Sequence, residues 1–298
     1  MRTKSNVLLL VVFTIVLSAC GRPENGSSRT VIQNKGSDTL VNVAQAWAEE
    51  YQTVDANVAV AVTGGGSGTG IAALMNDTVD IANASRQIKD SEMETLKGNG
   101  HNPVEFVVGF DALAIFLHPD NPIDEISLTQ LKAIYADGGE IVKWSQLGVT
   151  VPGCSSDEIV RISRQNNSGT YAYFREAVLD KEDFKLGSRD MHGSKDVVDI
   201  VMNTACAIGY SGLAYATEEV KMPCVTSSAE GGCVAPSVES AIDGSYPIAR
   251  PLFMYTADQP KGAVADYINW ILSDVGQCII LGKGYAPATT PTCPAPAI

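Results

Sequence analysis

The sequence predicts an α/β fold of two lobes with a ligand cleft between them, each lobe being a mixed, mostly parallel sheet flanked by helices. After residue 30, short β-type runs alternate with helical patterns, which is typical of a mostly parallel sheet. Two long extended runs, Val104 to His118 and Tyr246 to Tyr255, can each cross from one lobe to the other, and two crossings permit hinge closure around a ligand. The expected lobes are residues 30–110 plus 251–298 for lobe one and residues 111–250 for lobe two.

The elements of lobe one follow from residue spacing. Apolar residues between Leu40 and Tyr51 recur at helical spacing, and the alternating run Val58 to Val62 predicts the next strand. Val79 to Ala82 predicts a short strand that ends in Asn83-Ala84-Ser85-Arg86. Ser91 and Glu94 have the spacing of a capping box, so we expect a helix to start there.

In lobe two, the alternation of strands and helices continues. The extended run from Val104 is interrupted by the turn-type residues Gly109 to Asp111. Ser127 and Gln130 form a second capping-box pattern, and Ser168 opens a helical pattern that reaches Val178. Further predicted elements are a helix at Ser194 to Met202, a strand at Ala207 to Ser211 and, back in lobe one, a helix at Val264 to Leu272.

The N-terminus has the pattern of an export signal. A basic start is followed by 11 residues, Val7 to Leu17, that are apolar except for Thr14. This core is short for a membrane span. Leu17-Ser18-Ala19-Cys20 resembles a bacterial lipobox, so we expect residues 1–19 to be a signal peptide, Cys20 to carry lipid and residues 20–30 to be a polar tether. The alternative is an ordinary signal peptide with an unrelated cysteine.

Three turns rich in glycine and hydroxyl residues each follow a β-type run and open a helical pattern. They are Lys35 to Leu40, Thr63 to Gly70 and Arg164 to Thr170. Glycines let a ligand approach the backbone closely, and a helix start presents free N–H groups with a partial positive charge. One such turn is more often a flexible loop, but three of them suggest convergence on one anion.

The net charge limits the kind of ligand and the source of its attraction. The whole chain carries −13, and cleavage after residue 19 would remove Arg2 and Lys4 without any acid, which gives −15. Such a chain is a poor candidate for nucleic acid and repels anions at long range. An anion would therefore be held by local dipoles and a few placed cations.

Six cysteines follow Cys20, and an even number in an exported chain favours disulfides. Six cysteines allow 15 pairings. Close spacing suggests Cys224–Cys233 and Cys278–Cys293, which leaves Cys154–Cys206. A zinc site is the weaker alternative, because the chain has no C-x-x-C pair and only three histidines. We expect no metal.

The motifs of enzymes are missing from the glycine turns. Thr63 to Gly70 fits neither the P-loop, nor G-x-G-x-x-G, nor the nucleophile elbow. A serine hydrolase also needs a positioned base, and the surroundings of His101, His118 and His192 favour surface or loop positions. The sequence therefore predicts a binding protein that is not an enzyme and has no cofactor.

Four motifs together resemble the phosphate-binding subunits of bacterial phosphate ABC transporters: Gly36 to Thr39, Gly64 to Gly70, Val79 to Arg86 and Arg164 to Thr170. They match in order, and the similarity covers the chain from about residue 30 to residue 286. The resemblance implies a type II-like periplasmic-binding-protein fold with high-affinity binding of inorganic phosphate. It also implies delivery to an ABC transporter permease, from the periplasm or the outer face of the cytoplasmic membrane.

The resemblance also implies which residues bind phosphate. Thr39 and Leu40 would offer a hydroxyl and a backbone N–H, Arg164 would supply the cation, and the turn that follows it would close the site from lobe two. The alternative for Arg164 is a surface ion pair. The full expected set is Ser37, Asp38, Thr39, Leu40, Ser67, Gly68, Ser85, Arg86, Arg164, Ser168, Gly169 and Thr170.

One position departs from the family. Well-known members carry an aspartate where this chain has Ser85, and that carboxylate accepts the proton which distinguishes phosphate from sulfate. Arg86 would add positive charge there. We hypothesise that Asp38 replaces the missing acceptor; the alternative, equally favoured by its position, is a plain helix N-cap.

Three other functions stay open from the sequence. A binding protein for sulfate or another tetrahedral oxyanion is the nearest, because of Ser85. A secreted phosphatase on the same scaffold would need the base that the histidines do not provide. A phosphate-sensing or adhesive surface protein would need no permease.

Overall fold

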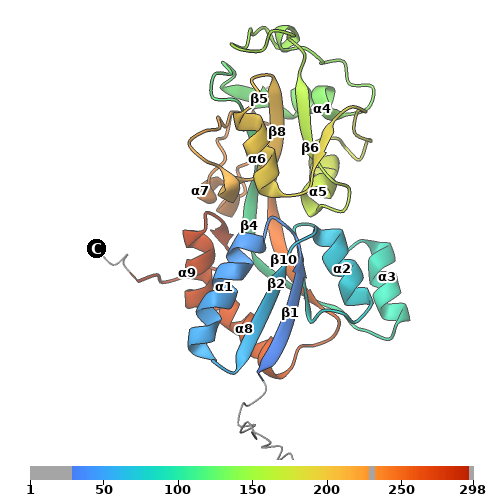
Figure 1. The fold of residues 1–298 in the computed structure, drawn as a ribbon, viewed down its shortest axis with the longest axis vertical. Helices are drawn as coiled ribbons and strands as arrows, with labels where there is room; N and C mark the ends of the chain where they lie inside the picture. The colour runs from blue at the N-terminus through green and yellow to red at the C-terminus, as the bar shows by residue number, and fades with distance from the viewer. Residues whose placement is uncertain (1–28, 228–231, 295–298) are drawn as a thin grey trace, which may run out of the picture.

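The structure, a computed structural model, describes residues 29–227 and 232–294. Figure 1 shows two lobes, one above the other, joined by the strands β4 (Val104–Leu117) and β10 (Ala249–Thr256). The predicted signal peptide, the expected lipidation at Cys20 and nearly all of the tether lie outside the described residues. No helix within the described ranges is both long enough and apolar enough to cross a membrane.

Lobe one is the lower lobe of Figure 1 and contains the predicted strand–helix alternation. The capping box expected at Ser91 and Glu94 is wrong, because the N-cap is Lys89, two residues earlier, and Glu92 accepts from the N–H of Lys89 at 2.9 Å. The elements are β1 (Thr30–Gly36), α1 (Val41–Val54), β2 (Val58–Thr63), α2 (Ser67–Met75), β3 (Ile81–Ala84), α3 (Asp90–Gly98), α8 (Gly262–Ile271), α9 (Asp274–Gly282) and β11 (Ala286–Pro287).

Lobe two lies above lobe one in Figure 1 and continues the alternation of strands and helices. Its predicted capping box is confirmed, since the Gln130 N–H donates to Ser127 Oγ at 3.1 Å and the Ser127 N–H donates to Gln130 Oε1 at 2.8 Å. The elements are β5 (Glu125–Ser127), α4 (Leu128–Tyr135), η1 (Trp144–Leu147), β6 (Val160–Arg164), α5 (Gly169–Ala177), β7 (Arg189–Met191), α6 (Ser194–Met202), β8 (Ala207–Gly212), η2 (Leu213–Tyr215), β9 (Cys224–Thr226) and α7 (Val238–Ile242).

The main sheet is mixed and continues through both lobes in the order β2-β1-β3-β10-β4-β8-β6-β7, with β11 on β4. β1 is parallel to β2 and β3, and β6 is parallel to β7 and β8, whereas β10 and β8 run antiparallel to β4. The α/β class is confirmed. The expectation of a separate sheet in each lobe differs from the structure, because β4 pairs with β10 in one half and with β8 in the other.

β4 is not interrupted at Gly109 to Asp111, so the predicted break is wrong. Gly109 serves close packing: a Cβ there would lie 2.4 Å from Ile280 Cδ1 and 2.8 Å from the Ala286 carbonyl oxygen. Asp111 is the register partner of Arg250 across the two strands. The exact boundaries of the lobes at residues 110/111 and 250/251 stay a prediction.

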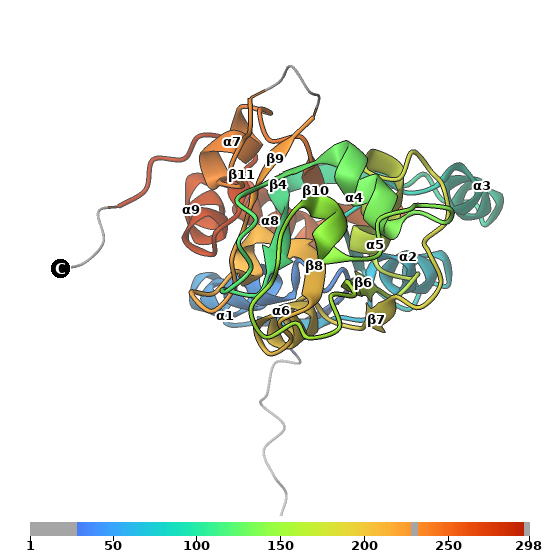
Figure 2. The ribbon, with the colours of Figure 1, turned by 90° about the horizontal axis from the view of Figure 1, so that it is seen from above.

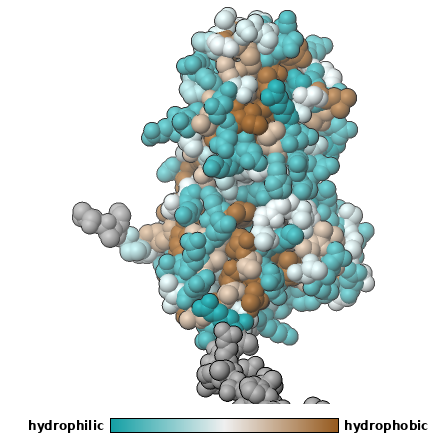
Figure 3. All heavy atoms as spheres, in the orientation of Figure 1, coloured by the Kyte–Doolittle hydropathy of each residue, from teal (hydrophilic) through white to brown (hydrophobic). Residues whose placement is uncertain are grey.

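Each lobe has its own buried apolar core. In lobe one, Trp47 on α1 contacts α9, because its indole N–H donates to the Gly276 carbonyl at 2.8 Å. In lobe two, Phe174 stacks on Tyr210 with ring centroids 3.9 Å apart. Figure 2 shows β4, β8 and β10 in the middle of the molecule with helices around them, and the face drawn in Figure 3 is mostly hydrophilic with scattered hydrophobic patches.

The three suggested disulfides are present: Cys154–Cys206, Cys224–Cys233 and Cys278–Cys293. The first joins two cysteines of lobe two that are 52 positions apart in the chain. The last links the segment after β11 to α9. The disulfides therefore stabilise each lobe internally.

Candidate anion site between the lobes

The three glycine-and-hydroxyl turns meet where the lobes face each other. Thr39 precedes α1 in lobe one and Thr170 lies at the start of α5 in lobe two, and their hydroxyl oxygens are 3.0 Å apart. The two residues are 131 positions apart in the chain. The expected convergence of these turns is therefore present in the fold.

The serines of lobe one form a connected group beside this contact. Ser37 Oγ donates to Ser85 Oγ at 2.8 Å, and the backbone N–H of Ser85 donates to Ser67 Oγ at 3.0 Å. The two hydroxyl oxygens of Ser67 and Ser85 are 3.3 Å apart. All three side chains are buried. We call Ser37, Thr39, Ser67, Ser85, Ser168 and Thr170 the hydroxyl cluster.

Lobe two reaches this cluster through the start of α5. Ser168 is the N-cap of α5, and its Oγ accepts from the Thr170 N–H at 3.1 Å. A Cβ on Gly169 would lie 2.3 Å from Ser67 Oγ and 2.5 Å from Ser85 Oγ. The close approach of the two lobes therefore requires glycine at position 169.

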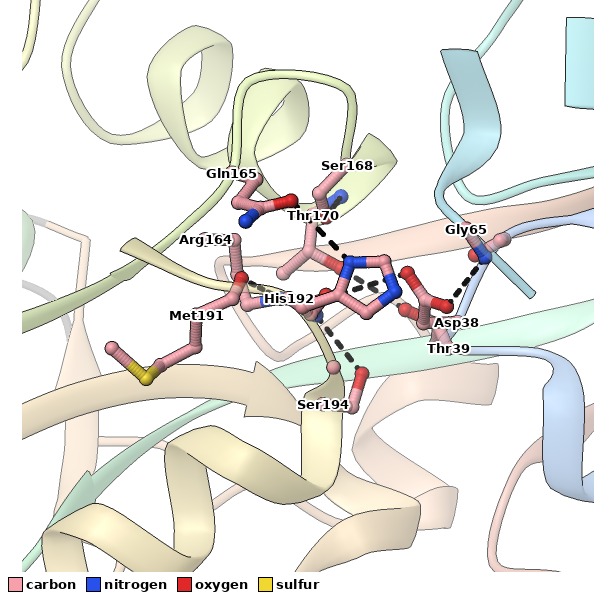
Figure 4. A network of polar contacts seen from close by, with 12 residues as sticks. Asp38, Thr39, Gly65, Arg164, Gln165, Ser168, Thr170, Met191, His192 and Ser194 are labelled. Atoms are coloured by element: carbon pink, nitrogen blue, oxygen red, sulfur yellow. Dashed lines mark hydrogen bonds and ion pairs between the residues drawn. The ribbon is translucent and has the colours of Figure 1, made fainter. Parts of the chain in front are cut away.

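Arg164 is completely buried next to the cluster, so the alternative of a surface ion pair is wrong. Its Nη1 donates to Ser194 Oγ at 2.9 Å, and its Nη2 donates to the His192 carbonyl at 2.8 Å (Figure 4). Nη2 also faces Asp38 Oδ2 at 3.4 Å across the lobes. Burial lowers the pKa of Arg164 and Asp38 opposes this shift, but a guanidinium stays protonated in proteins.

Asp38 bridges the first turn, the central turn and lobe two. Its Oδ1 accepts from the Gly65 N–H at 2.8 Å, and the Tyr215 hydroxyl donates to its backbone carbonyl at 2.6 Å. α1 begins at Val41 after Leu40, without a side-chain cap. The interpretation of Asp38 as a plain N-cap is therefore wrong.

The remaining expected residues have other partners. The Leu40 N–H donates to the Ser37 carbonyl at 3.1 Å, and the Gly68 N–H donates across the lobes to the Asn167 carbonyl at 2.9 Å. Arg86 is held by both oxygens of Glu92, at 2.7 and 2.8 Å. No hydrogen bond among the described residues joins Arg86 to the hydroxyl cluster, but Arg86 lines the same cavity as Ser85, and its Nη2 would lie 3.7 Å from a Cβ on Gly68.

Two buried residues that the sequence analysis missed border the cluster. Arg250 on β10 and Asp111 on β4 form an ion pair, with Nη2 and Oδ2 2.8 Å apart. Arg250 Nη1 donates to the Ser85 carbonyl at 3.1 Å, and Nη2 lies 3.0 Å from Thr170 Oγ1. Opposite charges inside two otherwise apolar runs are the signal that could have found them.

The charges around the cluster balance. Arg164 and Arg250 face Asp38 and Asp111, respectively. Burial raises the pKa of Asp111, and the nearby Arg250 opposes that shift. Among the described hydrogen bonds, none joins a histidine to the hydroxyl cluster. Oriented hydroxyls, helix starts and guanidinium groups suit a small oxyanion.

A cavity of about 330 Å³ adjoins the cluster from outside. It reaches Ser85 and Arg250, and apolar rings line part of its wall. Its lining residues are Ser85, Arg86, Gln87, Tyr173, Glu176, Arg250, Pro251 and Phe253. The cavity is therefore bounded by residues of both lobes and by the buried Arg250.

Two lobes joined by two crossing strands, with buried polar groups from both lobes facing each other, define a two-lobe substrate-binding protein. A family model described as the PBP superfamily domain matches residues 23–275. The phosphate-binding protein PstS of Pseudomonas aeruginosa is 34% identical over 86% of this chain and 82% of its own length. Protein SphX of Synechococcus elongatus is 32% identical over 91% and 81%, respectively.

A solved structure agrees with these relatives. A phosphate ABC transporter substrate-binding protein from Clostridium perfringens, with bound phosphate, matches with a TM-score of 0.77 and 27% identity, over 87% of this chain and 100% of that chain. The chain belongs to the PBP superfamily and, within it, to the family of the PstS phosphate-binding proteins.

Proposed function

We propose that this protein binds inorganic phosphate between its lobes and delivers it to the permease of an ABC transporter, without performing chemistry. The observation that carries the proposal is the buried contact between Thr39 and Thr170, where helix starts from both lobes meet. Relatives named phosphate-binding protein and a similar structure with bound phosphate support phosphate as the ligand.

In this proposal the ion is held by donors from both lobes. Thr39 and Ser67 donate from lobe one, and Ser168, Gly169 and Thr170 donate from the start of α5. Arg164 supplies positive charge, and Ser37, Asp38, Leu40, Gly68, Ser85 and Arg86 complete the expected set. Charge-assisted hydrogen bonds contribute roughly 1.5–3 kcal/mol each, so a few of them account for tight binding.

Closure around the ion would occur about β4 and β10, with the lobe boundaries at residues 110/111 and 250/251. Outside the described residues, lipid on Cys20 would hold the protein at the membrane after removal of residues 1–19. The protein would then act in the periplasm or on the outer face of the cytoplasmic membrane, next to its permease.

Sulfate or another tetrahedral oxyanion is the second candidate, because Ser85 stands where well-known family members carry a carboxylate. A hydroxyl can both donate and accept, so Ser85 rejects sulfate less strongly than an aspartate would. Asp38 remains our proposed acceptor for the phosphate proton, since it faces the central turn and Arg164.

Calorimetric titration of the mature, phosphate-stripped protein with phosphate and then sulfate, at pH 5.5 and pH 8, tests the function. Tight phosphate binding with no response to sulfate supports the phosphate transporter. Equal binding of both ions supports a general oxyanion-binding protein, and no binding of either refutes the proposal. Turnover of p-nitrophenyl phosphate by the same preparation would instead support a phosphatase.

A further inference from the structure

We propose that Arg250 is a second cation of the anion site that donates directly to the bound ion, and that Asp111 positions it. The inference rests on the proposed phosphate-binding function, because it adds residues to the same site. Neither residue belongs to a glycine-and-hydroxyl turn. Both come from the two strands that cross between the lobes.

The position of Arg250 is fixed by its partner strand. Arg250 and Asp111 are register partners on β10 and β4, and each is 1% exposed. Asp111 Oδ2 accepts from Arg250 Nη2 at 2.8 Å and from Nε at 3.2 Å. This two-nitrogen contact fixes the orientation of the guanidinium plane. The edge formed by Nη1 and Nη2 then faces the hydroxyl cluster.

That edge contacts both lobes. Arg250 Nη2 donates to Thr39 Oγ1 at 3.2 Å and to Thr170 Oγ1 at 3.0 Å, while Nη1 donates to the Ser85 carbonyl at 3.1 Å. Thr39 belongs to lobe one and Thr170 to lobe two. An oxyanion that accepts from both hydroxyls therefore comes within reach of the same nitrogen.

The number of hydrogens on Arg250 Nη2 favours a change of acceptor, from a threonine hydroxyl to a bound anion. This nitrogen carries two hydrogens, but Asp111 and the two threonine hydroxyls offer it three acceptors. One hydrogen is therefore shared between two neutral hydroxyl oxygens. A negatively charged oxygen is the stronger acceptor, so it takes over this hydrogen and frees both hydroxyls to donate to the ion as well.

Arg164 is held mainly by groups of lobe two. Its Nε, Nη1 and Nη2 already donate to Met191, Ser194 and His192 within lobe two. A buried ion pair such as Arg250–Asp111 generally adds little stability compared with an apolar pair of the same size. A role in ligand binding explains why both charges are placed at this point.

The competing explanation is structural, namely that the pair only ties β4 to β10. The double variant Asp111→Asn/Arg250→Met distinguishes the ligand-binding role from the structural role, because it removes both charges without leaving one buried and unpaired. Arg250→Lys is the conservative companion, since it keeps the charge and loses the planar fork. Arg175→Lys is the control, because Arg175 lies on α5 but pairs at the surface with Asp183.

Calorimetric titration with phosphate and the melting temperature are measured for each variant. We expect the double variant and Arg250→Lys to lose at least about tenfold in phosphate affinity, the value of one charge-assisted hydrogen bond, while Arg175→Lys binds like the wild type. Affinity within threefold of wild type in the double variant, at any melting temperature, would overturn the proposal.

A second measurement needs no variant. In crystals of the wild-type protein grown with phosphate, we expect an Arg250 Nη atom within about 3.2 Å of a phosphate oxygen. A phosphate bound between the lobes but more than about 4 Å from both Nη atoms overturns the role of Arg250 and leaves the proposed function intact. A wild-type protein that binds no phosphate in solution refutes the function itself.

Discussion

Replacing Gly169 by alanine should weaken phosphate binding while each lobe stays folded. Gly169 is the first residue of α5, and its φ is not positive, so alanine fits the backbone there. The added methyl would lie 2.3 Å from Ser67 Oγ and 2.5 Å from Ser85 Oγ. Both oxygens belong to lobe one, so the clash exists only when the lobes are closed.

The size of the effect follows from this overlap. Ordinary van der Waals contact begins at 3.4 Å, so the lobes would have to stay about 1 Å further apart near α5. A hydrogen bond lengthened by about 1 Å is lost. Losing one or two charge-assisted bonds from lobe two costs about 3 kcal/mol, or about 100-fold in phosphate affinity.

The assay is calorimetric titration with phosphate, together with the melting temperature of the ligand-free protein. Gly98→Ala is the matched control, because a Cβ on Gly98 at the end of α3 meets nothing within 4 Å. We expect that control to bind phosphate normally and to gain about 0.4–1 kcal/mol of stability. Phosphate affinity of Gly169→Ala within threefold of wild type would refute the closure argument.

Three further predictions concern other parts of the molecule. Asp38→Asn should weaken phosphate binding and relax the rejection of sulfate in competition titrations; an unchanged selectivity ratio would exclude Asp38 as the proton acceptor. Replacing Cys154 and Cys206 by serine should cost about 4 kcal/mol in urea unfolding, because the disulfide closes a loop of 52 residues. The hydrogen bond to Asp258 raises the pKa of His101, so His101 stabilises the fold below pH about 6.5 and this contribution is lost as pH rises through the raised pKa. His101→Gln should therefore lower the melting temperature at pH 5.5 but not at pH 9.

The convergence of the two turns of lobe one, Lys35 to Leu40 and Thr63 to Gly70, could be predicted from sequence because it follows from topology. Each turn succeeds a strand and precedes a helix, and the strands β1 and β2 are parallel neighbours. Parallel strands end at the same edge of a sheet, so residues in such turns lie close together whatever their separation in the chain. The rule accounts for the lobe-one members of the hydroxyl cluster. Ser168 and Thr170 follow β6 in the other lobe and join the cluster because the two lobes face each other.

Arg250 and Asp111 could not be found by the same rule. Asp111 follows Gly109 and Phe110, and Arg250 precedes Pro251, so both resemble turn residues inside extended runs. The structure keeps both in continuous strands, since Gly109 accommodates Ile280 and each charge neutralises the other. Their pairing depends on the register of β4 against β10, which local spacing does not contain.

Capping rules failed at Asp38 for a related reason. They consider only neighbours within one turn of helix, and by that measure Asp38 is well placed before α1. Its carboxylate instead accepts from Gly65, 27 positions away, and faces Arg164 in the other lobe. A contact over that distance competes with the local cap, and only the assembled fold decides between them.

The paired charges also explain how an acidic protein can hold an anion. Arg164 and Arg250 each face a carboxylate, so the site has no net formal charge and creates little long-range attraction. Stabilisation of the ion must then come from short-range donors, which are the hydroxyls, the helix starts of α2 and α5 and the guanidinium N–H groups that we propose for the site. These act only within hydrogen-bond distance, and the donors from α5 reach the ion only when the lobes close. If the lobes close about β4 and β10 as proposed, we expect binding and closure to be coupled.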